Sequence, residues 1–270
     1  MIPKIIHYCW FGAKEKDDKI RSCIQSWYRF LPDYTFKEWT DKDISKLDQN
    51  HYVSQAYQAK KYAFVSDVFR LYALYTEGGI YLDTDVEVKK SFNPLLDLDF
   101  FIGSERYGHE THIATAVIGA QKQSPIIKRL LKTYDDIEFR IPTGYDMTPN
   151  TIRLIPPLKS CGFKRVYTDT YPIYKDRRNI IFPTGVFSKE SKDSYAVHHF
   201  MASWVDDFKC QYRARIRFFK HIFGFYKYKQ VKSNGIMVYP DNMVYKLAEF
   251  KYGKKHKILI IKEREKHASV

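Results

Sequence analysis

Long apolar runs are absent from this 270-residue chain, and the absence limits what the protein can be. The longest runs fall far short of the ~18 residues that a membrane-spanning helix needs. Cysteine is scarce, and Cys9, Cys23, Cys161 and Cys210 form no CxxC pair of the kind found in zinc modules. Scattered thiols suit a reducing compartment. The opening MIPKIIHYCWFG lacks the basic start and long apolar stretch of a secretory signal. We therefore expect a cytoplasmic protein.

The composition favours a folded enzyme-sized domain. Hydrophobic residues make up 44% of the chain and aromatic residues 17%, which is enough to bury a sizeable core. No internal repeat or low-complexity segment interrupts the chain. The net charge of +14 is uneven, because residues 205–270 alone contribute +10. We expect a catalytic domain over residues 1–204 and a separate basic extension over residues 205–270.

Strands and helices alternate through the first 135 residues. Strands are expected at 2–11, 34–39, 80–82, 86–88, 99–103, 116–120 and 194–198. Helices are expected at 17–30, 43–47, 52–61, 63–76, 125–134 and 150–161, and residues 164–187 favour short strands and loops. This order predicts an α/β sandwich with a mainly parallel sheet, whose ligands lie beyond the carboxyl ends of its strands.

The segment AFVSDVFRLYALYTEGGIYLDTD, residues 63–85, carries the most specific pattern. A helix stops at Gly78-Gly79, a short apolar strand follows, and Asp83 and Asp85 come directly after it. On an extended backbone, side chains two residues apart point the same way, so both carboxylates can face one ion. Hard divalent cations prefer such oxygen ligands. A polar turn is the simpler alternative, but the context favours a metal site for a diphosphate.

Asp67 and Arg70 lie one turn apart on the helix that precedes this strand. They could form an ordinary surface ion pair, which contributes little to stability. The rest of the helix is apolar, however, so a charged pair on it needs another reason. The planar guanidinium of Arg70 suits a diphosphate, and Asp67 could accept from sugar hydroxyls or orient Arg70.

Two aromatic or imidazole positions complete the candidate site. Trp10 ends the first strand and could stack a nucleobase, although a core tryptophan is equally expected. His198 and His199 are adjacent, so on a strand they point to opposite sides and at most one faces the site. Imidazole is a plausible further ligand for Mn²⁺ beside two carboxylates.

Taken together, these residues resemble glycosyltransferase family 32, which includes mannosyltransferases and many bacterial capsular-polysaccharide transferases. The resemblance rests on IPKIIHYCWFG, SDVFRLYALYTEGGIYLDTDVEV and AVHHFMASW, in that order within residues 1–204. The middle segment is also similar to the clostridial glucosylating toxins. The resemblance implies a GT-A fold and a retaining transfer that depends on Mn²⁺ or Mg²⁺. The donor would be a UDP- or GDP-sugar, and the acceptor a lipid-linked glycan of a capsule or other surface polysaccharide.

The resemblance also implies roles in the donor pocket, residue by residue. Trp10 would stack the base, and Tyr81 would line the pocket. Asp67 and Arg70 would bind the donor sugar, with Arg70 near the phosphates.

A second group of residues would hold the metal and close the site. Asp83 would contact ribose, sugar or metal, and Asp85 would be the direct ligand. His198 would match the late metal-site histidine of the family. Ser203 and Trp204 would belong to a loop that closes over the diphosphate. No motif residue is recognised in residues 105–190.

The basic extension indicates a setting and not a reaction. Its apolar positions Tyr212, Ile216, Phe219, Phe223 and Tyr226 have helical spacing, with Arg213, Arg217, Lys220 and Lys227 off that stripe. The pattern favours a helix on an anionic membrane surface, on the inner face of the cell membrane. A helix packed on the domain is nearly as plausible. Nucleic-acid binding is not expected, because no reading motif accompanies the charge.

Other functions remain open from the sequence alone. One is a different metal-dependent enzyme of nucleotide-sugars, such as a hydrolase or a nucleotidyltransferase. The segment WFGAKEK is a poor version of the glycine-rich basic loop that a nucleotidyltransferase usually shows. A non-catalytic lectin or membrane-binding module is the third hypothesis, and an effector toxin is a weaker fourth.

Overall fold

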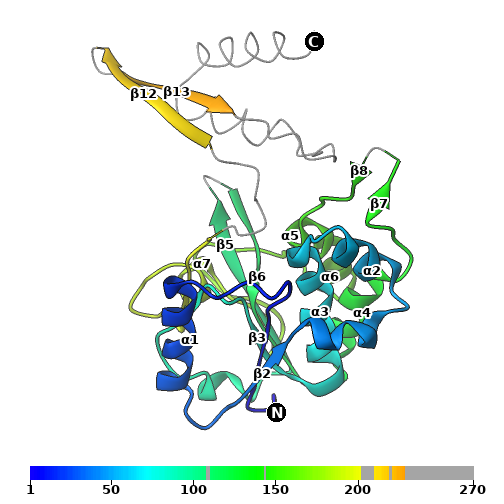
Figure 1. Cartoon of the computed structure of the whole chain (residues 1–270). Helices are drawn as coiled ribbons and strands as arrows, with labels where there is room; N and C mark the ends of the chain where they lie inside the picture. The colour runs from blue at the N-terminus through cyan, green and yellow to red at the C-terminus, as the bar shows by residue number, and fades with distance from the viewer. Residues whose placement is uncertain (108–109, 143, 202–209, 219–220, 229–270) are drawn as a thin grey trace. The chain divides into compact units, whose positions relative to one another are not determined.

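The computed structural model describes residues 1–107, 110–142, 144–201, 210–218 and 221–228 (Figure 1). Contacts divide the chain into two units. One comprises Met1–Arg140 with Thr148–Trp204, and the other comprises Ile141–Met147 with Val205–Val270. Every candidate site residue that the structure describes lies in the first unit. The assignment of 205–270 as a separate domain stays a prediction.

A seven-stranded sheet forms the centre of the first unit, in the order β2-β1-β3-β6-β5-β10-β9. Its strands are β1 (Ile5–Cys9), β2 (Thr35–Trp39), β3 (Gly79–Leu82), β5 (Phe100–Tyr107), β6 (Glu110–Ala120), β9 (Ile173–Asp176) and β10 (Asn179–Ile181). Only β6 and β9 run against the other five strands. The predicted α/β sandwich with a mainly parallel sheet is therefore confirmed.

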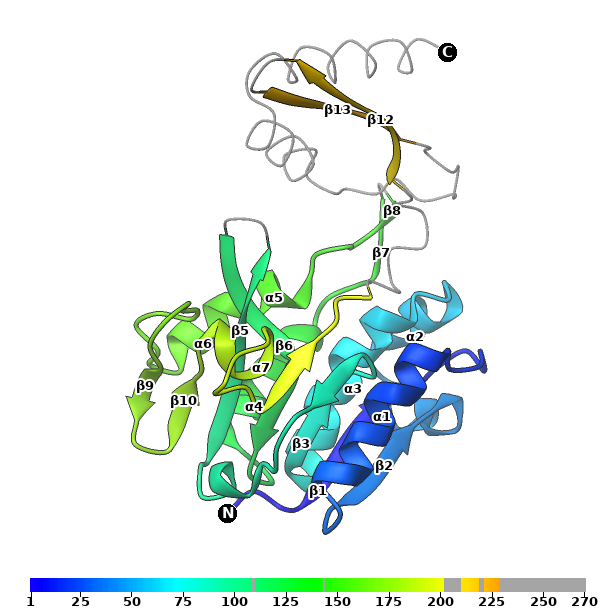
Figure 2. The same cartoon turned by 90° about the vertical axis from the view of Figure 1, so that its left-hand side faces the viewer.

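Helices cover both faces of this sheet (Figures 1 and 2). On one face lies α1 (Asp18–Phe30), with α7 (Thr184–Phe187) on the same side. The opposite face carries α2 (His51–Gln58), α3 (Tyr62–Glu77), α4 (Pro125–Leu131), α5 (Asn150–Arg153) and α6 (Ile155–Ser160). Three 3₁₀ turns complete the unit: η1 (Asp41–Leu47), η2 (Asn93–Leu95) and η3 (Lys132–Tyr134).

Local chemistry explains where these elements begin and end. Asp17 caps α1 by accepting from the amide of Ile20. The short helix expected over 43–47 is a 3₁₀ turn that begins at Asp41 and is capped by Thr40. The single helix expected over 150–161 is split into α5 and α6. A proline at position 156 has no amide hydrogen, so the helix cannot continue unbroken through it.

The glycine pair behind the candidate site is required by space and backbone angle. Gly78 and Gly79 end α3 with φ of 71° and 110°, which side chains rarely permit. A Cβ at Gly79 would lie 2.6 Å from the carbonyl oxygen of Ile5. These glycines let the chain turn from α3 directly into β3, so Arg70 on the helix and Asp83 after the strand belong to one compact unit.

A small second sheet follows the candidate site along the chain. It pairs β4 (Val86–Val88) with β11 (Ala196–His198) in antiparallel fashion, with His198 opposite Val86. The pairing therefore brings the late histidines beside the residues that follow Asp85.

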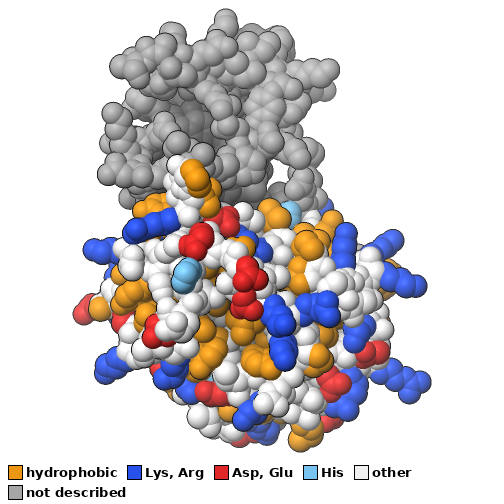
Figure 3. Space-filling model, turned by 90° about the vertical axis from the view of Figure 1, so that its right-hand side faces the viewer, with side chains coloured by type: hydrophobic (Ala, Val, Ile, Leu, Met, Phe, Trp, Pro, Cys, Tyr) orange, Lys and Arg blue, Asp and Glu red, His pale blue; other side chains and the backbone are white. Residues whose placement is uncertain are grey.

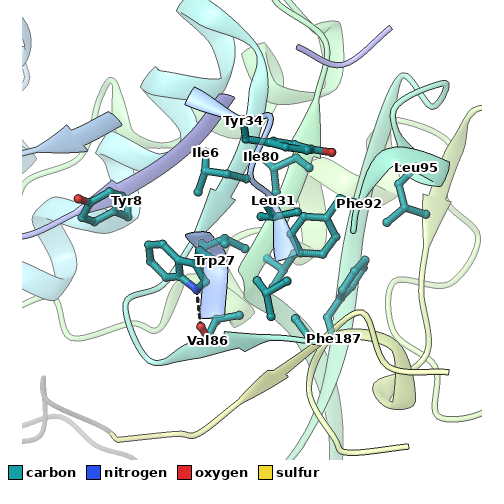
Figure 4. Packing of buried hydrophobic residues seen from close by; sticks show 14 of the residues in the cluster. Ile6, Tyr8, Trp27, Leu31, Tyr34, Ile80, Val86, Phe92, Leu95 and Phe187 are labelled. Carbon is teal, nitrogen blue, oxygen red and sulfur yellow. Dashed lines mark hydrogen bonds between the residues drawn. The ribbon is translucent and has the colours of Figure 1, made fainter. Parts of the chain in front are cut away.

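Beneath this sheet, the core is built around Trp27 of α1 (Figure 4). Its side chain is fully buried, and its indole nitrogen donates to the carbonyl oxygen of Val86 at 2.7 Å. Ser26 adds a second link by accepting from the amide of Val88 at 2.8 Å. Helix α1 thus holds β4 at the point where the chain leaves the aspartate pair.

The surface over α2 and α4 in the first unit shows no patch of a single side-chain type. On the face that carries α2 and α4, basic, acidic and hydrophobic side chains are interspersed (Figure 3). Among the described residues, no helix has both the length and the apolar composition needed to cross a membrane.

The predicted helix in the basic extension is wrong for the residues that the structure describes there. There, β12 (Cys210–Phe218) and β13 (His221–Tyr228) pair in antiparallel fashion. In CQYRARIRF, arginine recurs at every second position from Arg213 to Arg217, with Ala214 and Ile216 between the arginines. Period-two alternation is the strand pattern. The second unit also contains the short strand β8 (Gly144–Tyr145).

Candidate active site

Asp83 and Asp85 lie at the carboxyl end of β3, in a tight turn. The amide of Asp83 donates to Ala116, and the amide of Val86 donates back to the carbonyl of Asp83 at 3.0 Å. The expectation of an extended DTD segment is therefore corrected: a turn brings the two carboxylates together. The turn forms because the chain must leave the main sheet and enter β4 of the second sheet.

Three potential metal ligands converge at this turn. One ligand atom from each of Asp83, Asp85 and His198 lies within 4.8 Å of the others, and all three residues are partly buried. Two carboxylate oxygens and one imidazole nitrogen suit Mn²⁺, and Mg²⁺ would accept the oxygens. The donor set therefore fits the predicted cation. The identity of the metal is part of the proposal below.

The segment after β11 wraps around Asp85. The amide of His199 donates to the main-chain carbonyl of Asp85 at 3.1 Å, and the amide of Met201 donates to Oδ2 at 2.9 Å. Phe200 makes the bend possible with a φ of 50°, and its ring lies 4.0 Å from that of His198. A non-glycine residue with positive φ is uncommon and marks a constrained turn. Asp85 therefore anchors this segment before any ligand binds.

The charges at the cluster are strongly coupled. Burial lowers the pKa of His198, but the carboxylates of Asp85 and Glu105 outweigh it and raise the value to about 10. Burial acts in the opposite sense on Asp85, yet its contacts with His198 and the Met201 amide leave its pKa below the ordinary value. At neutral pH His198 is therefore protonated between these carboxylates.

Arg70 lies beneath the aspartates and is only 5% exposed. Its Nη2 contacts Asp67 at 2.9 Å and Asp83 at 3.3 Å. Its Nη1 donates to the carbonyl of Thr115 at 2.8 Å, and its Nε donates to that of Ser66 at 3.3 Å. In this structure the guanidinium joins helix α3 to the turn and to β6, and its role in donor binding stays a prediction.

Asp67 is the most perturbed carboxylate of the group. Burial raises its pKa to about 7, with a further upward effect from Asp83 and an opposing one from Arg70. The side-chain amide of Asn150 donates to its Oδ1 at 2.5 Å, and Thr115 donates to Asn150 in turn. Asn150 was missed in the sequence, because it lies 83 residues from Asp67 in a region without a recognisable motif.

Tyr81 is fully buried and serves Asp83. Its hydroxyl donates to Asp83 Oδ1 at 2.9 Å, and the Arg70 guanidinium lies 4.7 Å from the centre of its ring. This hydrogen bond fixes the orientation of the Asp83 carboxylate.

Trp10 follows β1 at the same edge of the sheet, because β1 and β3 are parallel and His7 pairs with Tyr81. Its ring is partly buried and lies beneath the ammonium of Lys16 at 5.1 Å. It lines a shallow groove of about 440 Å³ together with Ala13, Lys14, Glu15, Lys16, Glu38, Thr40, Asp41 and Lys42. The placement is compatible with base stacking, which stays a prediction.

The two adjacent histidines separate as expected from a strand. His198 faces Asp85, with Nε2 to Oδ1 at 3.4 Å. His199 turns away and meets Glu87 through Nε2 at 2.9 Å. The geometry favours His198 as the ligand. Ser203 and Trp204, the predicted closing loop, lie outside the described residues.

Comparison with known proteins gives the class of the chain. Residues 17–101 match the family model described as the glycosyltransferase sugar-binding region containing the DXD motif. The resemblance to glycosyltransferase family 32 is therefore confirmed, and the chain carries a glycosyltransferase domain of this type.

Two fungal mannosyltransferases are similar in sequence to this chain. Inositol phosphoceramide mannosyltransferase 3 of Schizosaccharomyces pombe is 30% identical over 141 residues, which cover 51% of this chain and 38% of that protein. Inositol phosphoceramide mannosyltransferase 1 of the same organism is 33% identical over 115 residues, which cover 37% and 33%. The chain thus spans well under half the length of these two relatives.

A solved structure described as PaToxG glycosyltransferase is 27% identical. The matched region covers 49% of this chain and 60% of the chain in that structure, with a TM-score of 0.40.

Proposed function

We propose that this protein is a retaining, Mn²⁺- or Mg²⁺-dependent hexosyltransferase that moves a sugar from a UDP- or GDP-sugar to a glycan acceptor. The observation that carries the proposal is the convergence of Asp83, Asp85 and His198 at the carboxyl end of β3. The edge of an open α/β sheet is the usual place for such a ligand. The matched DXD region supports the reaction class.

The chain's own residues would divide the work between holding the cation and holding the sugar. Asp85 and His198 would ligate the cation, with Asp83 beside them. Bound there, a divalent cation offsets charge on the departing nucleoside diphosphate. Arg70 and Tyr81 keep the Asp83 carboxylate in place, so it need not reorganise during the reaction.

Asp67 is suited to recognise a sugar hydroxyl. With a pKa of about 7 it changes protonation near neutrality, so it can accept or donate a hydrogen bond. No side chain is assigned as a nucleophile. Retention would follow from front-face attack assisted by the leaving phosphate.

The acceptor we propose is a lipid-linked glycan, with capsule or other surface polysaccharide as the product. The names of the two fungal relatives contain inositol phosphoceramide, which is a lipid acceptor, and mannose as the sugar. The strong positive charge of residues 205–270 would favour an anionic membrane where such an acceptor is found.

The test measures donor binding and donor hydrolysis on the intact chain. UDP, GDP and their sugars are screened by thermal shift with and without Mn²⁺, and the donor that binds is then used in hydrolysis assays. A ligand at a hundred times its Kd should stabilise the protein by about 2.7 kcal/mol. Asp85→Asn should lower kcat/KM at least about a hundredfold, because it removes an anionic ligand.

Asp97→Asn is the matched control, since Asp97 is an exposed aspartate outside the site. It should leave both assays unchanged. Full activity in chelator, or full activity of Asp85→Asn, would contradict a metal-dependent mechanism. Stabilisation by donor without any hydrolysis or transfer would indicate a binding module.

A further inference from the structure

The imidazole of His198 has a carboxylate near each of its ring nitrogens. Nε2 lies 3.4 Å from Asp85 Oδ1, and Nδ1 lies 3.6 Å from Glu105 Oε2. The His198 side chain is 13% exposed, and Nδ1 is buried without a hydrogen-bond partner among the described residues. A buried polar atom in this position calls for a partner, because leaving it unsatisfied is costly.

Glu105 is placed where it can become that partner. It lies on β5, opposite His112 of β6, and its side chain is only 16% exposed. Within the described part of the chain, the group of three candidate ligands does not include Glu105. Its carboxylate therefore stands behind the imidazole, on the side away from Asp85, and not in the set that would touch the cation.

The ring itself is restricted from a third direction. Phe200 lies over the imidazole with 4.0 Å between ring centres. The main chain of His198 is fixed by pairing with Val86 of β4. The backbone and one ring face of His198 are both constrained. The remaining freedom is rotation of the imidazole about its Cβ–Cγ bond, and this rotation decides which nitrogen faces Asp85.

We propose that Glu105 is a positioning residue, which accepts the Nδ1 proton of His198 and so holds Nε2 toward the cation between Asp83 and Asp85. The inference rests on the proposed metal site. A neutral imidazole that ligates through Nε2 must carry its proton on Nδ1, and a carboxylate is a strong acceptor for that proton. Such a contact fixes the tautomer and makes the ligating nitrogen more basic.

The neighbouring histidine offers a matched control. His199 also meets a carboxylate, with Nε2 2.9 Å from Glu87 Oε2, but it points away from the cluster. Glu87→Gln removes the same negative charge from the same region of the molecule. It therefore separates the specific effect of Glu105 from a general loss of charge near the cation.

The experiment titrates Mn²⁺ into the intact chain without donor or acceptor and follows free Mn²⁺ by electron paramagnetic resonance. Electron spin-echo measurements on the bound ion then detect coupling to an imidazole nitrogen. Glu105→Ala should weaken Mn²⁺ binding about ten- to a hundredfold and diminish the nitrogen coupling. Glu105→Gln keeps an oxygen acceptor of similar shape and should lose less, and Glu87→Gln should bind within about twofold of the wild type.

The outcomes separate this inference from the proposed function. If His198→Ala abolishes the nitrogen coupling while both Glu105 variants bind Mn²⁺ as the wild type does, the positioning role is overturned and the metal site stands. If the wild-type protein shows no nitrogen coupling or no binding, the metal site and this inference fail together. Unchanged Mn²⁺ binding with a raised KM for acceptor would make Glu105 an acceptor contact instead. If Glu105→Ala does not fold, the glutamine variant alone decides.

Discussion

At the scale of single residues, Oδ1 of Asp83 is held by two side chains. It receives the Tyr81 hydroxyl at 2.9 Å and lies 3.3 Å from Arg70 Nη2. Both partners are buried, and both come from the hydrophobic interior below the turn. Contacts to a charged group in a poorly solvated place are stronger than the same contacts in water. The orientation of Asp83 is therefore set by the protein before a ligand arrives.

Replacing Arg70 by lysine should show how much depends on the shape of the guanidinium. Lysine keeps the charge but cannot contact Asp67, Asp83 and Thr115 together. We expect a loss of about 2–3 kcal/mol in unfolding free energy and of at least about a hundredfold in kcat/KM. Urea unfolding and donor hydrolysis measure the two effects.

Arg129→Lys provides the control. Arg129 is exposed, and its guanidinium donates one weak hydrogen bond, to the hydroxyl of Ser160. It should change stability by less than about 0.5 kcal/mol. Near wild-type values for both properties in Arg70→Lys would show that a positive charge alone is sufficient.

His7 is a second residue whose state is set by its surroundings. It is fully buried, with Nε2 2.8 Å from the carbonyl of Gly78 and Nδ1 accepting from the Trp39 indole at 3.2 Å. Burial lowers its pKa, and the Gly78 contact opposes that effect only in part. The neutral imidazole with its proton on Nε2 satisfies both neighbours, whereas a second proton on Nδ1 would face the Trp39 donor.

This arrangement predicts a stability that falls with acidity. The pKa of His7 is lower in the folded protein than its value of about 6.5 in the unfolded chain. Below pH 6.5 the unfolded chain therefore binds a proton at His7 more readily than the folded protein does. The contribution of His7 is present above that pH and is lost as pH falls below it, by up to about 1.4 kcal/mol per pH unit. Urea unfolding from pH 7.5 to 5 should show a shallower dependence in His7→Gln than in the wild type. Parallel curves would mean that His7 does not titrate in this range.

At the scale of elements, the turn at residues 83–86 depends on the helix below it. Trp27 and Ser26 of α1 hold the two ends of β4 through one hydrogen bond each. The β11 strand then brings His198 against Val86. Helix α1, near the start of the chain, thus supports a candidate site whose proposed ligands lie between residues 83 and 198.

Trp27→Phe should disturb this support. The phenyl ring leaves the Val86 carbonyl without the indole donor and leaves some core volume unfilled, so we expect a loss of about 2–4 kcal/mol. Mn²⁺ binding should also weaken, because Asp85 directly precedes Val86. Tyr28→Phe on the same helix removes an exposed hydroxyl and should cost less than about 0.5 kcal/mol. Destabilisation without any change in Mn²⁺ binding would show that α1 supports the fold but not the site.

The paired strands β12 and β13 show why the helix expected in this region was wrong. The 4-3-4-3 spacing of apolar residues from Tyr212 to Tyr226 predicts a helix, but arginine also recurs in period two from Arg213 to Arg217. Two periodicities coexist in a stretch that is rich in aromatic and basic residues. Antiparallel pairing of 210–218 with 221–228 decides between them. Pairing is a contact between strands, and no single window of sequence contains it.

At the scale of the whole molecule, the charge distribution is the dominant feature. Residues 205–270 hold 16 Lys and Arg against 6 Asp and Glu, a net of +10 out of +14 for the chain. Such a concentration attracts anionic partners at low salt and is screened as salt rises. An anionic membrane is the partner we propose, and the proposal now rests on charge and not on a helical stripe.

Liposome binding tests this. The wild-type chain should cosediment with vesicles that contain anionic lipid and should be released as salt rises, since each basic residue near the surface contributes about 1 kcal/mol. Glutamate at Arg213, Arg215 and Arg217 should abolish cosedimentation and slow transfer to a lipid-linked acceptor, with little effect on donor hydrolysis. Glutamate at Lys122, Lys128 and Lys132, in the first unit, is the control of equal charge. No binding of the wild type at low salt would rule out the membrane role.

The sequence by itself determined the local plan of the molecule. The alternation of strands and helices, the stop at Gly78-Gly79, and the aspartate pair after a buried strand could all be read in short windows. Each depends on backbone angles, caps or periodicity within a few residues. The sequence also placed Trp10 and Asp83 at the same edge of the sheet, because parallel strands end together.

The tertiary structure decided what lies around those residues. Asn150 reaches Asp67 across 83 positions, and Glu105 approaches His198 from β5, a strand that contains no recognisable motif. The selection of His198 over His199 follows from the pairing of β11 with β4. The turn that joins the two aspartates exists because the chain passes from one sheet to another. These contacts join segments far apart in the chain, and their positions depend on how whole elements pack together.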